Sequence, residues 1–276
     1  MPVQVFRIAA PSPQPPAPST QPPALIDSGM DKVVVITGAS GGIGAATAEA
    51  LAGRGARLAL VARRADALGA VASRCGPNAL AIVADVTSRV EVRRVVEAAL
   101  AHFGGIDVWI NNVGRGISRL PSELSDQDVD DMIRVNVLTA LYGMQEVLPH
   151  FKERGAGHII NVSSMLGRIP LTPIRSAYTA AKHFLNGLTA CFRTEIQQIQ
   201  PGIHVSLVSP GVVRTDFGRN ALYGGPDSRQ LPDSQSAEEV AEVIAGVVES
   251  PRPDVYTRQG ARDRVVGYFA SLGANP

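Results

Sequence analysis

The sequence lacks a strong charge imbalance and any long apolar run. Its 276 residues carry a formal net charge of +1, so no basic or acidic surplus indicates binding to nucleic acid or to an anionic membrane. No apolar run approaches the roughly 18–20 residues that a membrane-spanning helix needs. We therefore expect no nucleic acid and no membrane among its partners. The chain is 45% apolar, which is ample for a large core in one or two domains.

Cysteine and histidine are too few and too scattered to hold a metal ion. Cys75 and Cys191 lie far apart, and neither they nor the five histidines show a metal-ligand spacing. We predict no metal site and two free thiols in a reducing compartment, which favours a cytoplasmic protein.

The first 29 residues differ in composition from the rest of the chain. They hold eight of the twenty prolines, and only Arg7 and Asp27 are charged. Such a tract buries too little apolar surface to fold, so residues 1–29 are expected to form a disordered or polyproline-like tail. It lacks the continuous apolar stretch of a secretory signal. It is either a ligand for a small proline-recognition domain or, as we prefer, a dispensable segment upstream of a functional start at Met30.

From Lys32 onward, short apolar runs alternate with longer segments of helical period. The expected strands are Val33–Thr37, Arg57–Val61, Ala79–Val83, Asp107–Asn111, His158–Val162, His204–Val208 and Val255–Thr257. The expected helices are Ala45–Arg54, Ala65–Arg74, a helix capped by Ser88 with Glu91 that runs to Phe103, a long helix from Ser125 through Asn136 toward Phe151, Ala177–Ile199, Ala237–Ser250 and Arg262–Leu272. This alternation predicts an α/β fold, a doubly wound parallel sheet of about seven strands flanked by helices, in one domain over residues 30–276. Ligands of such sheets gather at the carboxyl ends of the strands.

A glycine-rich turn follows the first strand and opens a helix. It reads Thr37-Gly38-Ala39-Ser40-Gly41-Gly42-Ile43-Gly44. Glycines there permit a tight turn and let backbone amides approach a pyrophosphate at the helix N-terminus. Glycine spacing alone is a weak signal, and a plain turn is the alternative. The place of the turn after the first strand favours dinucleotide binding.

The end of the second strand predicts which dinucleotide binds. An acidic residue about twenty positions after the turn commonly binds the ribose hydroxyls, but this strand ends in Ala62-Arg63-Arg64. A carboxylate would repel a 2′-phosphate, whereas an arginine pairs with it through two hydrogen bonds. We predict NADP(H) rather than NAD(H), chiefly through Arg63. Arg64 is alternatively a solvated residue at a helix start.

Tyr178 and Lys182 lie four residues apart, and Tyr178 follows Ser164 by fourteen residues. In a helix, positions i and i+4 share a face. A phenol with a pKa near ~10 is a poor acid or base at neutral pH. A neighbouring lysine cation is expected to lower that pKa toward the working range. The pair therefore predicts proton transfer.

Taken together, these motifs resemble the short-chain dehydrogenase/reductase family over about residues 32–257. The matching segments are the turn Thr37–Gly44, Asn111-Asn112-Val113-Gly114, the helix residue Asn136, Ser164, the Tyr178–Lys182 pair, and Ser209-Pro210-Gly211 through Thr215. Two features depart from the family pattern. The gap between Ser164 and Tyr178 is one residue longer than is usual, and Gly41 stands where some NADP-preferring members carry a basic residue.

The resemblance implies a single-domain Rossmann enzyme that interconverts a ketone or aldehyde and an alcohol with NADP(H). Ser164 would bond the substrate carbonyl, and Tyr178 would transfer the proton. Lys182 would tune Tyr178 and hold the nicotinamide ribose, and Asn136 would position a relay water. The implied cofactor-binding residues are Thr37, Gly38, Ser40, Gly42, Ile43, Gly44, Arg63, Arg64, Asp85, Val86, Asn112, Gly114, Tyr178, Lys182, Pro210, Gly211, Val213 and Thr215.

A small-molecule substrate is expected above the nicotinamide, bordered by Met165, Leu166, Ile174 and the segment Phe217–Leu231. The glycines and the proline of that segment predict a mobile lid. The apolar residues along this border favour a hydrophobic or ring-shaped ketone.

Two other functions and one partner follow from the same residues. Epimerisation of a sugar nucleotide is disfavoured, because only about 60 residues after Thr215 remain for a substrate domain. A regulatory protein that senses NADP(H) without turnover would not need Tyr178. The pattern Phe184/Leu185/Leu188/Phe192 is either core or, as the resemblance implies, a contact with a second copy in a homodimer or homotetramer.

Overall fold

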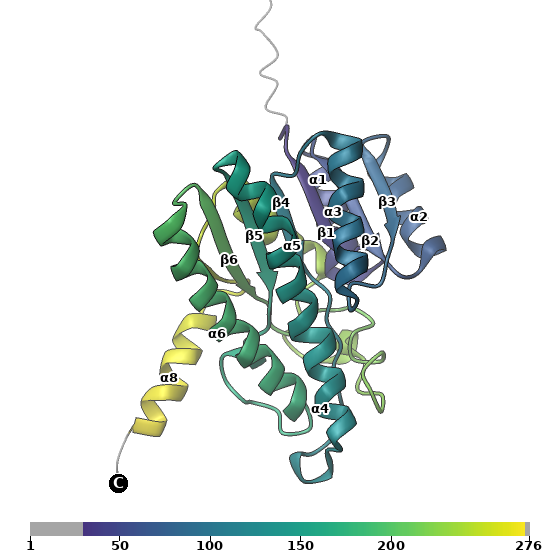
Figure 1. The fold of residues 1–276 in the computed structure, drawn as a ribbon. Coiled ribbons are helices and arrows are strands. Elements are labelled where there is room, and N and C mark those ends of the chain that lie inside the picture. Colours follow the sequence, from purple (N-terminus) through teal and green to yellow (C-terminus); the bar gives the residue numbers. More distant parts are fainter. Residues whose placement is uncertain (1–29, 274–276) are drawn as a thin grey trace, which may run out of the picture.

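Within residues 30–273, which the computed structural model describes, seven parallel strands form one sheet (Figure 1). They are β1 (Val33–Thr37), β2 (Arg57–Ala62), β3 (Ala79–Val83), β4 (Val108–Asn111), β5 (Gly157–Val162), β6 (Ile203–Ser209) and β7 (Asp254–Tyr256). Their order across the sheet is β3-β2-β1-β4-β5-β6-β7. The chain runs outward from β1 to β3 and then returns to place β4 on the other side of β1.

The central strands are buried on both faces, which explains their unbroken apolar sequences. In β1, Val34 and Ile36 pack with the helices on one face, whereas Val35 packs with those on the other. Parallel pairing places Val34 opposite Leu58 of β2 and Val108 of β4. Each strand therefore contributes to two core layers.

Helices cover both faces of the sheet. One face carries α1 (Gly42–Ala52), α2 (Ala65–Cys75) and α7 (Ala237–Glu249). The other carries α3 (Arg89–Phe103), α5 (Thr139–Arg154) and α6 (Ser176–Ile199), which lie in front of the sheet in Figure 1. The remaining helices are α4 (Asp126–Ile133) and α8 (Ala261–Gly273), with 3₁₀ turns η1 (Pro121–Glu123), η3 (Met165–Gly167) and η4 (Ser228–Gln230). The predicted doubly wound parallel sheet is confirmed.

The long helix predicted from Ser125 is wrong in one respect, because it contains a wider turn. After α4, residues Arg134–Leu138 form a π-helical segment, η2, before α5 begins. Asn136 lies in this segment, with both ends of its side-chain amide bonded to the backbone of Arg115. Such inserted turns recur at functional sites.

Side-chain caps define the helix starts. The Ser88 hydroxyl accepts a hydrogen bond from the Glu91 amide at 3.5 Å, as its position predicts, but the Glu91 carboxylate pairs with Arg94 instead of closing a capping box. Complete capping boxes occur where Ser125 begins α4 and Ser236 begins α7.

The predicted tail over residues 1–29 lies outside the described residues, and the single-domain boundary at residue 30 stays a prediction. None of the helices in residues 30–273 is both long and apolar enough to cross a membrane.

Candidate active site

The site forms at the carboxyl ends of β1 and β4, which are paired neighbours in the sheet. The Thr37 hydroxyl donates to the Ile110 carbonyl at 3.1 Å and accepts from the Asn112 amide at 3.0 Å. The Asn112 side-chain amide donates to the carbonyl oxygens of Thr37, at 3.2 Å, and Gly38, at 3.4 Å. These bonds hold the glycine-rich turn against the end of β4.

The turn has the backbone conformation that only glycine adopts easily. Gly38 and Gly42 have φ values of +70° and +55°, in the left-handed region. A Cβ on Gly44 would collide with the carbonyl oxygen of Gly38. After Gly41, α1 begins with no side-chain cap and no acid in its first turn. Its amides therefore remain free for an anion, which fits the pyrophosphate of a dinucleotide.

Two guanidinium groups lie beside this turn. Arg64 Nη2 donates to the carbonyl oxygen of Ser40 at 3.2 Å and to its hydroxyl at 3.1 Å. Gly41 leaves room for this contact, because a Cβ there would lie 3.3 Å from Arg64 Nη2. Arg63 is 73% exposed, and its Nη1 lies 3.9 Å from Asp85 Oδ2. Arg64 thus contacts the turn directly, whereas Arg63 reaches toward the end of β3.

The two predicted cofactor contacts after β3, Asp85 and Val86, differ in their surroundings. Asp85 Oδ1 accepts hydrogen bonds from the amide and the hydroxyl of Thr87, at 3.0 and 2.9 Å. Val86 is buried in the core beneath α3. Of the two predicted cofactor contacts, Asp85 therefore presents a polar side chain at this edge and Val86 does not.

Ser164, Tyr178 and Lys182 come together from two elements. Ser164 follows β5, and its hydroxyl accepts from the Leu166 amide at 3.1 Å. Tyr178 and Lys182 project from the first two turns of α6, as their spacing predicts. Their side chains are buried, and Lys182 Nζ lies 5.8 Å from the centre of the Tyr178 ring.

The predicted lowering of the tyrosine pKa is wrong for the protein alone. Burial raises the pKa of Tyr178 to about 12, although the side chains of Ser164 and Arg175 lower it in part. Burial lowers the pKa of Lys182 to about 8. Lys182 Nζ donates to the Val162 carbonyl at 3.0 Å, so its charge is directed toward the backbone of β5 and not toward the phenol.

Asn136 and Lys182 meet at Gly114, after β4. A Cβ on Gly114 would lie 3.1 Å from Asn136 Oδ1 and 3.5 Å from Lys182 Nζ. Asn136 Nδ2 donates to the Arg115 carbonyl at 3.0 Å, and its Oδ1 accepts from the Arg115 amide at 3.0 Å. Asn136 therefore holds the segment that faces Lys182. Its predicted role in placing a water stays a prediction.

The loop after β6 closes the cofactor side of the site. Thr215 lies against the glycine-rich turn, because a Cβ on Gly42 would lie 3.2 Å from Thr215 Cγ2. The Pro210 carbonyl accepts from the Met165 amide at 2.7 Å, which joins this loop to the segment after β5. Val213 is buried in the core with α7.

Two of the predicted substrate-facing residues lie close to Tyr178. The Phe217 ring packs edge-on against the Tyr178 ring at 5.3 Å between centroids, and Leu166 packs against the same apolar cluster. Ile174 is exposed, and Met165 packs in a separate cluster with Ala261 of α8. The structure thus brings Leu166 and Phe217 to the tyrosine, but not Met165.

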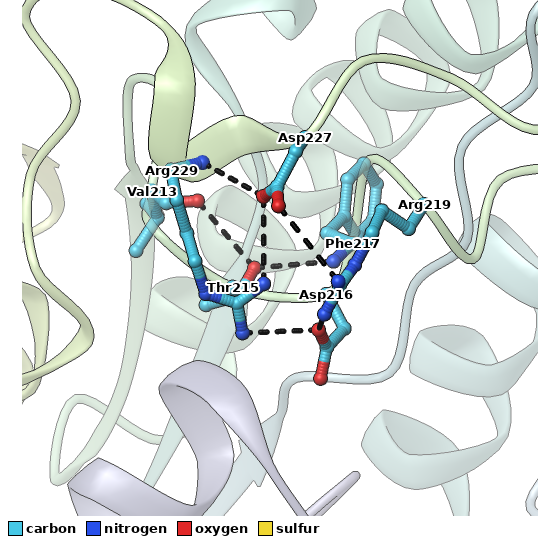
Figure 2. Close-up of polar contacts among 7 residues, drawn as sticks. All are labelled: Val213, Thr215, Asp216, Phe217, Arg219, Asp227 and Arg229. Atoms are coloured by element: carbon cyan, nitrogen blue, oxygen red, sulfur yellow. Dashed lines mark hydrogen bonds and ion pairs between the residues drawn. The ribbon is translucent and has the colours of Figure 1, made fainter.

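A closed ring of ion pairs, which the sequence analysis did not identify, holds the predicted lid (Figure 2). Its four members alternate in sign: Asp216, Arg219, Asp227 and Arg229. Arg219 pairs with Asp216, and its Nη1 lies 3.8 Å from Asp227 Oδ2. Arg229 lies 3.0 Å from Asp216 Oδ1 and 3.4 Å from Asp227 Oδ1. The ring ties the two ends of the lid together.

A second set of contacts fastens the lid to the start of α4. The Tyr223 hydroxyl donates to Asp128 Oδ1 at 2.8 Å, and Arg119 Nη1 pairs with Asp128 Oδ2 at 2.9 Å. Hydrogen bonds from the Ser125 backbone, Tyr223 and Arg119 hold the pKa of the Asp128 carboxyl well below its usual range. Tyr223 itself has a φ of +62°, a strained value for an aromatic residue. The lid is docked here, and its mobility stays a prediction.

Sequence comparison finds a family model and oxidoreductases that are similar to this chain. A model of the short chain dehydrogenase family matches residues 32–223. An uncharacterized oxidoreductase of Bacillus subtilis is 33% identical over 255 residues, which cover 88% of this chain and 69% of the relative. An uncharacterized oxidoreductase of Staphylococcus epidermidis is 31% identical over 221 residues, covering 80% of this chain and 92% of the relative.

Solved structures are similar over most of the chain. A short-chain dehydrogenase/reductase from Burkholderia phymatum, in complex with NAD, is 25% identical with a TM-score of 0.81, covering 91% of this chain and 98% of that one. An alcohol dehydrogenase from Thermococcus sibiricus, complexed with 5-hydroxy-NADP, is 30% identical with a TM-score of 0.71, covering 82% of this chain and 95% of that one.

Proposed function

Because this chain belongs to the short-chain dehydrogenase/reductase family and is an oxidoreductase of that type, we propose that it interconverts a ketone or aldehyde and an alcohol with NADP(H). One observation carries the proposal. Tyr178 is buried beside Ser164 and Lys182 at the carboxyl edge of the sheet, next to a glycine turn whose amides suit a pyrophosphate.

Bound NADP(H) would supply or accept the hydride at its nicotinamide. The turn at Gly38–Gly44 and the start of α1 would hold its pyrophosphate. Ser164 would donate a hydrogen bond to the substrate oxygen, and Tyr178 would exchange the proton with that oxygen. A phenol with a pKa of about 12 is protonated at neutral pH, so Tyr178 carries the proton that carbonyl reduction consumes, although it is a weaker acid than a free phenol.

Lys182 and Asn136 support this proton transfer. With a pKa lowered to about 8, Lys182 gives up and regains a proton more easily near neutral pH than an exposed lysine does. Asn136 holds the backbone of Arg115, and so keeps Gly114 beside Lys182 Nζ. We propose that a water at this point connects Lys182 to solvent.

Preference for NADP(H) is supported by the two arginines and by the lack of an acid where β2 ends. Arg64 already contacts Ser40, and Arg63 reaches toward Asp85 from the adjacent position, so a 2′-phosphate would meet both guanidinium groups. Solved relatives include complexes with NAD and with 5-hydroxy-NADP, so the choice depends on this chain's own residues. Arg63→Ala and Arg64→Ala should each raise the KM for NADPH by about tenfold to a hundredfold and leave that for NADH nearly unchanged. Equal changes in the KM for NADPH and for NADH would contradict the assignment of NADP(H) as the preferred cofactor.

The test of the reaction compares wild type with Tyr178→Phe. NADPH oxidation is followed across a panel of ketones and aldehydes, and cofactor binding is measured separately by calorimetry. Wild type should turn over at least one carbonyl, and Tyr178→Phe should lose about a hundredfold to ten-thousandfold in kcat while still binding NADPH. A wild-type protein that binds NADPH but reduces no carbonyl would instead be a cofactor sensor. Epimerisation would appear as substrate conversion without net NADPH consumption.

We also propose a cytoplasmic homodimer or homotetramer. Cys75 and Cys191 are both free thiols, which supports a reducing compartment. Leu185 and Phe192 of α6 are buried in the chain's own core, whereas Phe184 stays exposed and is available to a second copy.

A further inference from the structure

Arg175 is a cation without a carboxylate partner beside the proposed reaction centre. It precedes Tyr178 by three residues, at the start of α6, and is partly buried. Its Nη1 donates to the Ile117 carbonyl at 3.1 Å. No carboxylate in residues 30–273 forms an ion pair with it, and its Nε and Nη2 make no hydrogen bond to that part of the chain.

Three other arginines near the lid are neutralised, whereas Arg115 is exposed, forms no ion pair within residues 30–273 and donates from its Nε to the Asn220 carbonyl at 3.2 Å. Arg119 pairs with Asp128, and both Arg219 and Arg229 pair with Asp216. Burying an unpaired cation is unfavourable, so its burial calls for a compensating partner. Burial lowers the pKa of Arg175 from its ordinary value, yet an arginine remains charged at any physiological pH. A partly buried cation that lacks a carboxylate partner beside a proposed reaction centre is a candidate for substrate recognition.

Two glycines make room for the Arg175 guanidinium group next to the packed rings of Tyr178 and Phe217. A Cβ on Gly116 would lie 3.0 Å from Arg175 Nη1 and 3.1 Å from Phe217 Cε1. A Cβ on Gly225, in the lid, would lie 2.6 Å from Arg175 Nη2. Phe217 in turn packs against Tyr178. The charge therefore lies between the lid and the segment after β4, on the side of Tyr178 that Phe217 covers.

We propose that Arg175 is a specificity-determining residue that binds a carboxylate on the substrate, so that the preferred substrate is an oxo acid. The inference rests on the proposed carbonyl reduction and adds the charge of the molecule reduced. The free Nε and Nη2 donors form the fork that binds both oxygens of a carboxylate. The carbonyl carbon gains the hydride, the carbonyl oxygen gains the Tyr178 proton, and the carboxylate stays unchanged. This substrate differs from the neutral, hydrophobic ketone that the apolar border predicts.

The first experiment measures binding without turnover. Benzoate and benzamide are titrated into the complex of the protein with NADP⁺, and the thermal unfolding midpoint is recorded. Wild type should be stabilised by benzoate and not by benzamide. Arg175→Met should bind benzoate at least about tenfold more weakly, and Arg175→Lys should fall between the two. Arg134→Met removes an exposed charge on η2 and should behave as wild type. Equal benzoate binding by wild type and Arg175→Met would overturn the proposal.

The second experiment compares oxo acids with their methyl esters as substrates. For Arg175→Met, the KM of the acid should rise by about tenfold or more, while kcat for the ester stays within about threefold. Equal losses for acid and ester would show a structural role for Arg175 and would sink the proposal. Arg175-dependent benzoate binding without any turnover would leave this site standing and refute the reductase function. Turnover of the ester in preference to the acid would support the reductase function and refute the carboxylate site at Arg175. If Arg175→Met does not fold, the weaker effect expected of Arg175→Lys decides both experiments.

Discussion

At the scale of single residues, the proposed role of Lys182 in proton transfer conflicts with the stability of the fold. Burial lowers its pKa from 10.5 to about 8, so the folded state resists the charge that the residue carries at neutral pH. This difference between the unfolded-state and folded-state pKa lowers the free energy of unfolding at pH 7 by on the order of 3 kcal/mol. Lys182→Met should therefore raise the free energy of unfolding at pH 7 while abolishing turnover, which chemical denaturation of the cofactor-free protein would show.

The pH dependence of this effect has a definite sign. Below pH 8 the lysine is charged in both folded and unfolded states, and the full cost applies. As pH rises from about 8 to 10.5, only the unfolded state still binds the proton, so wild type gains stability relative to Lys182→Met. The gap between the two proteins should shrink over this range. A Lys182→Met protein that is less stable at pH 7, or a gap that does not change, would contradict this account.

Residue types and spacing predict where Ser164, Tyr178 and Lys182 lie, because a strand end and a helical i, i+4 pair need no knowledge of distant contacts. The direction of the Tyr178 pKa shift is not predictable in this way. It depends on burial, to which Phe217 contributes from a loop far along the chain. The role of Arg175 is not predictable from sequence either, because it depends on distant contacts. Its lack of a carboxylate partner follows from the pairing of Asp128 with Arg119 and of Asp216 with Arg229.

At the scale of elements, the ring of ion pairs should control the lid. Asp227 Oδ1 accepts the Arg229 amide at 3.0 Å, a bond that an asparagine oxygen preserves. Asp227→Asn therefore removes the charge but keeps the turn. Trypsin cleavage after Arg219 and Arg229 should accelerate several-fold, since exposed pairs are individually weak but act together here.

The matched control for the lid is Asp233→Asn. Asp233 is exposed, forms no ion pair within the described chain, and has a φ of +58° that asparagine tolerates. Its cleavage pattern should equal that of wild type. High salt should speed cleavage of wild type and narrow its difference from Asp227→Asn, because salt screens the ring. Unchanged cleavage of Asp227→Asn would mean that the contacts of Tyr223 with Asp128 suffice to hold the lid.

Helix starts are predictable from local capping, as Ser88 shows, but the π-helical segment at Asn136 is not. The apolar pattern from Ser125 continues through both α4 and α5, so it predicts one regular helix. The wider turn is stabilised by hydrogen bonds between Asn136 and Arg115, which lies after β4. A contact across the fold therefore overrides the local preference.

At the scale of the whole molecule, alternation of apolar strands and helices suffices to predict the fold class, because each central strand must be covered on both faces. It does not predict that β4 returns beside β1, which creates the edge where Thr37 and Asn112 bond. That return depends on pairing across the sheet, where Val34 lies between Leu58 and Val108.

Assembly of copies is the property of the whole molecule that a single substitution tests most directly. Phe184 of α6 is 55% exposed, and an apolar groove lined by Val129, Ile133 and Ala180 lies one helical turn away. Phe184→Glu should convert the proposed oligomer to a monomer in light scattering, because the charge would be buried in the interface. Phe269→Glu on α8, which changes a residue that is 54% exposed, should leave the mass unchanged. Dissociation by Phe269→Glu alone would place the interface on α8, and a monomeric wild type would refute the assembly.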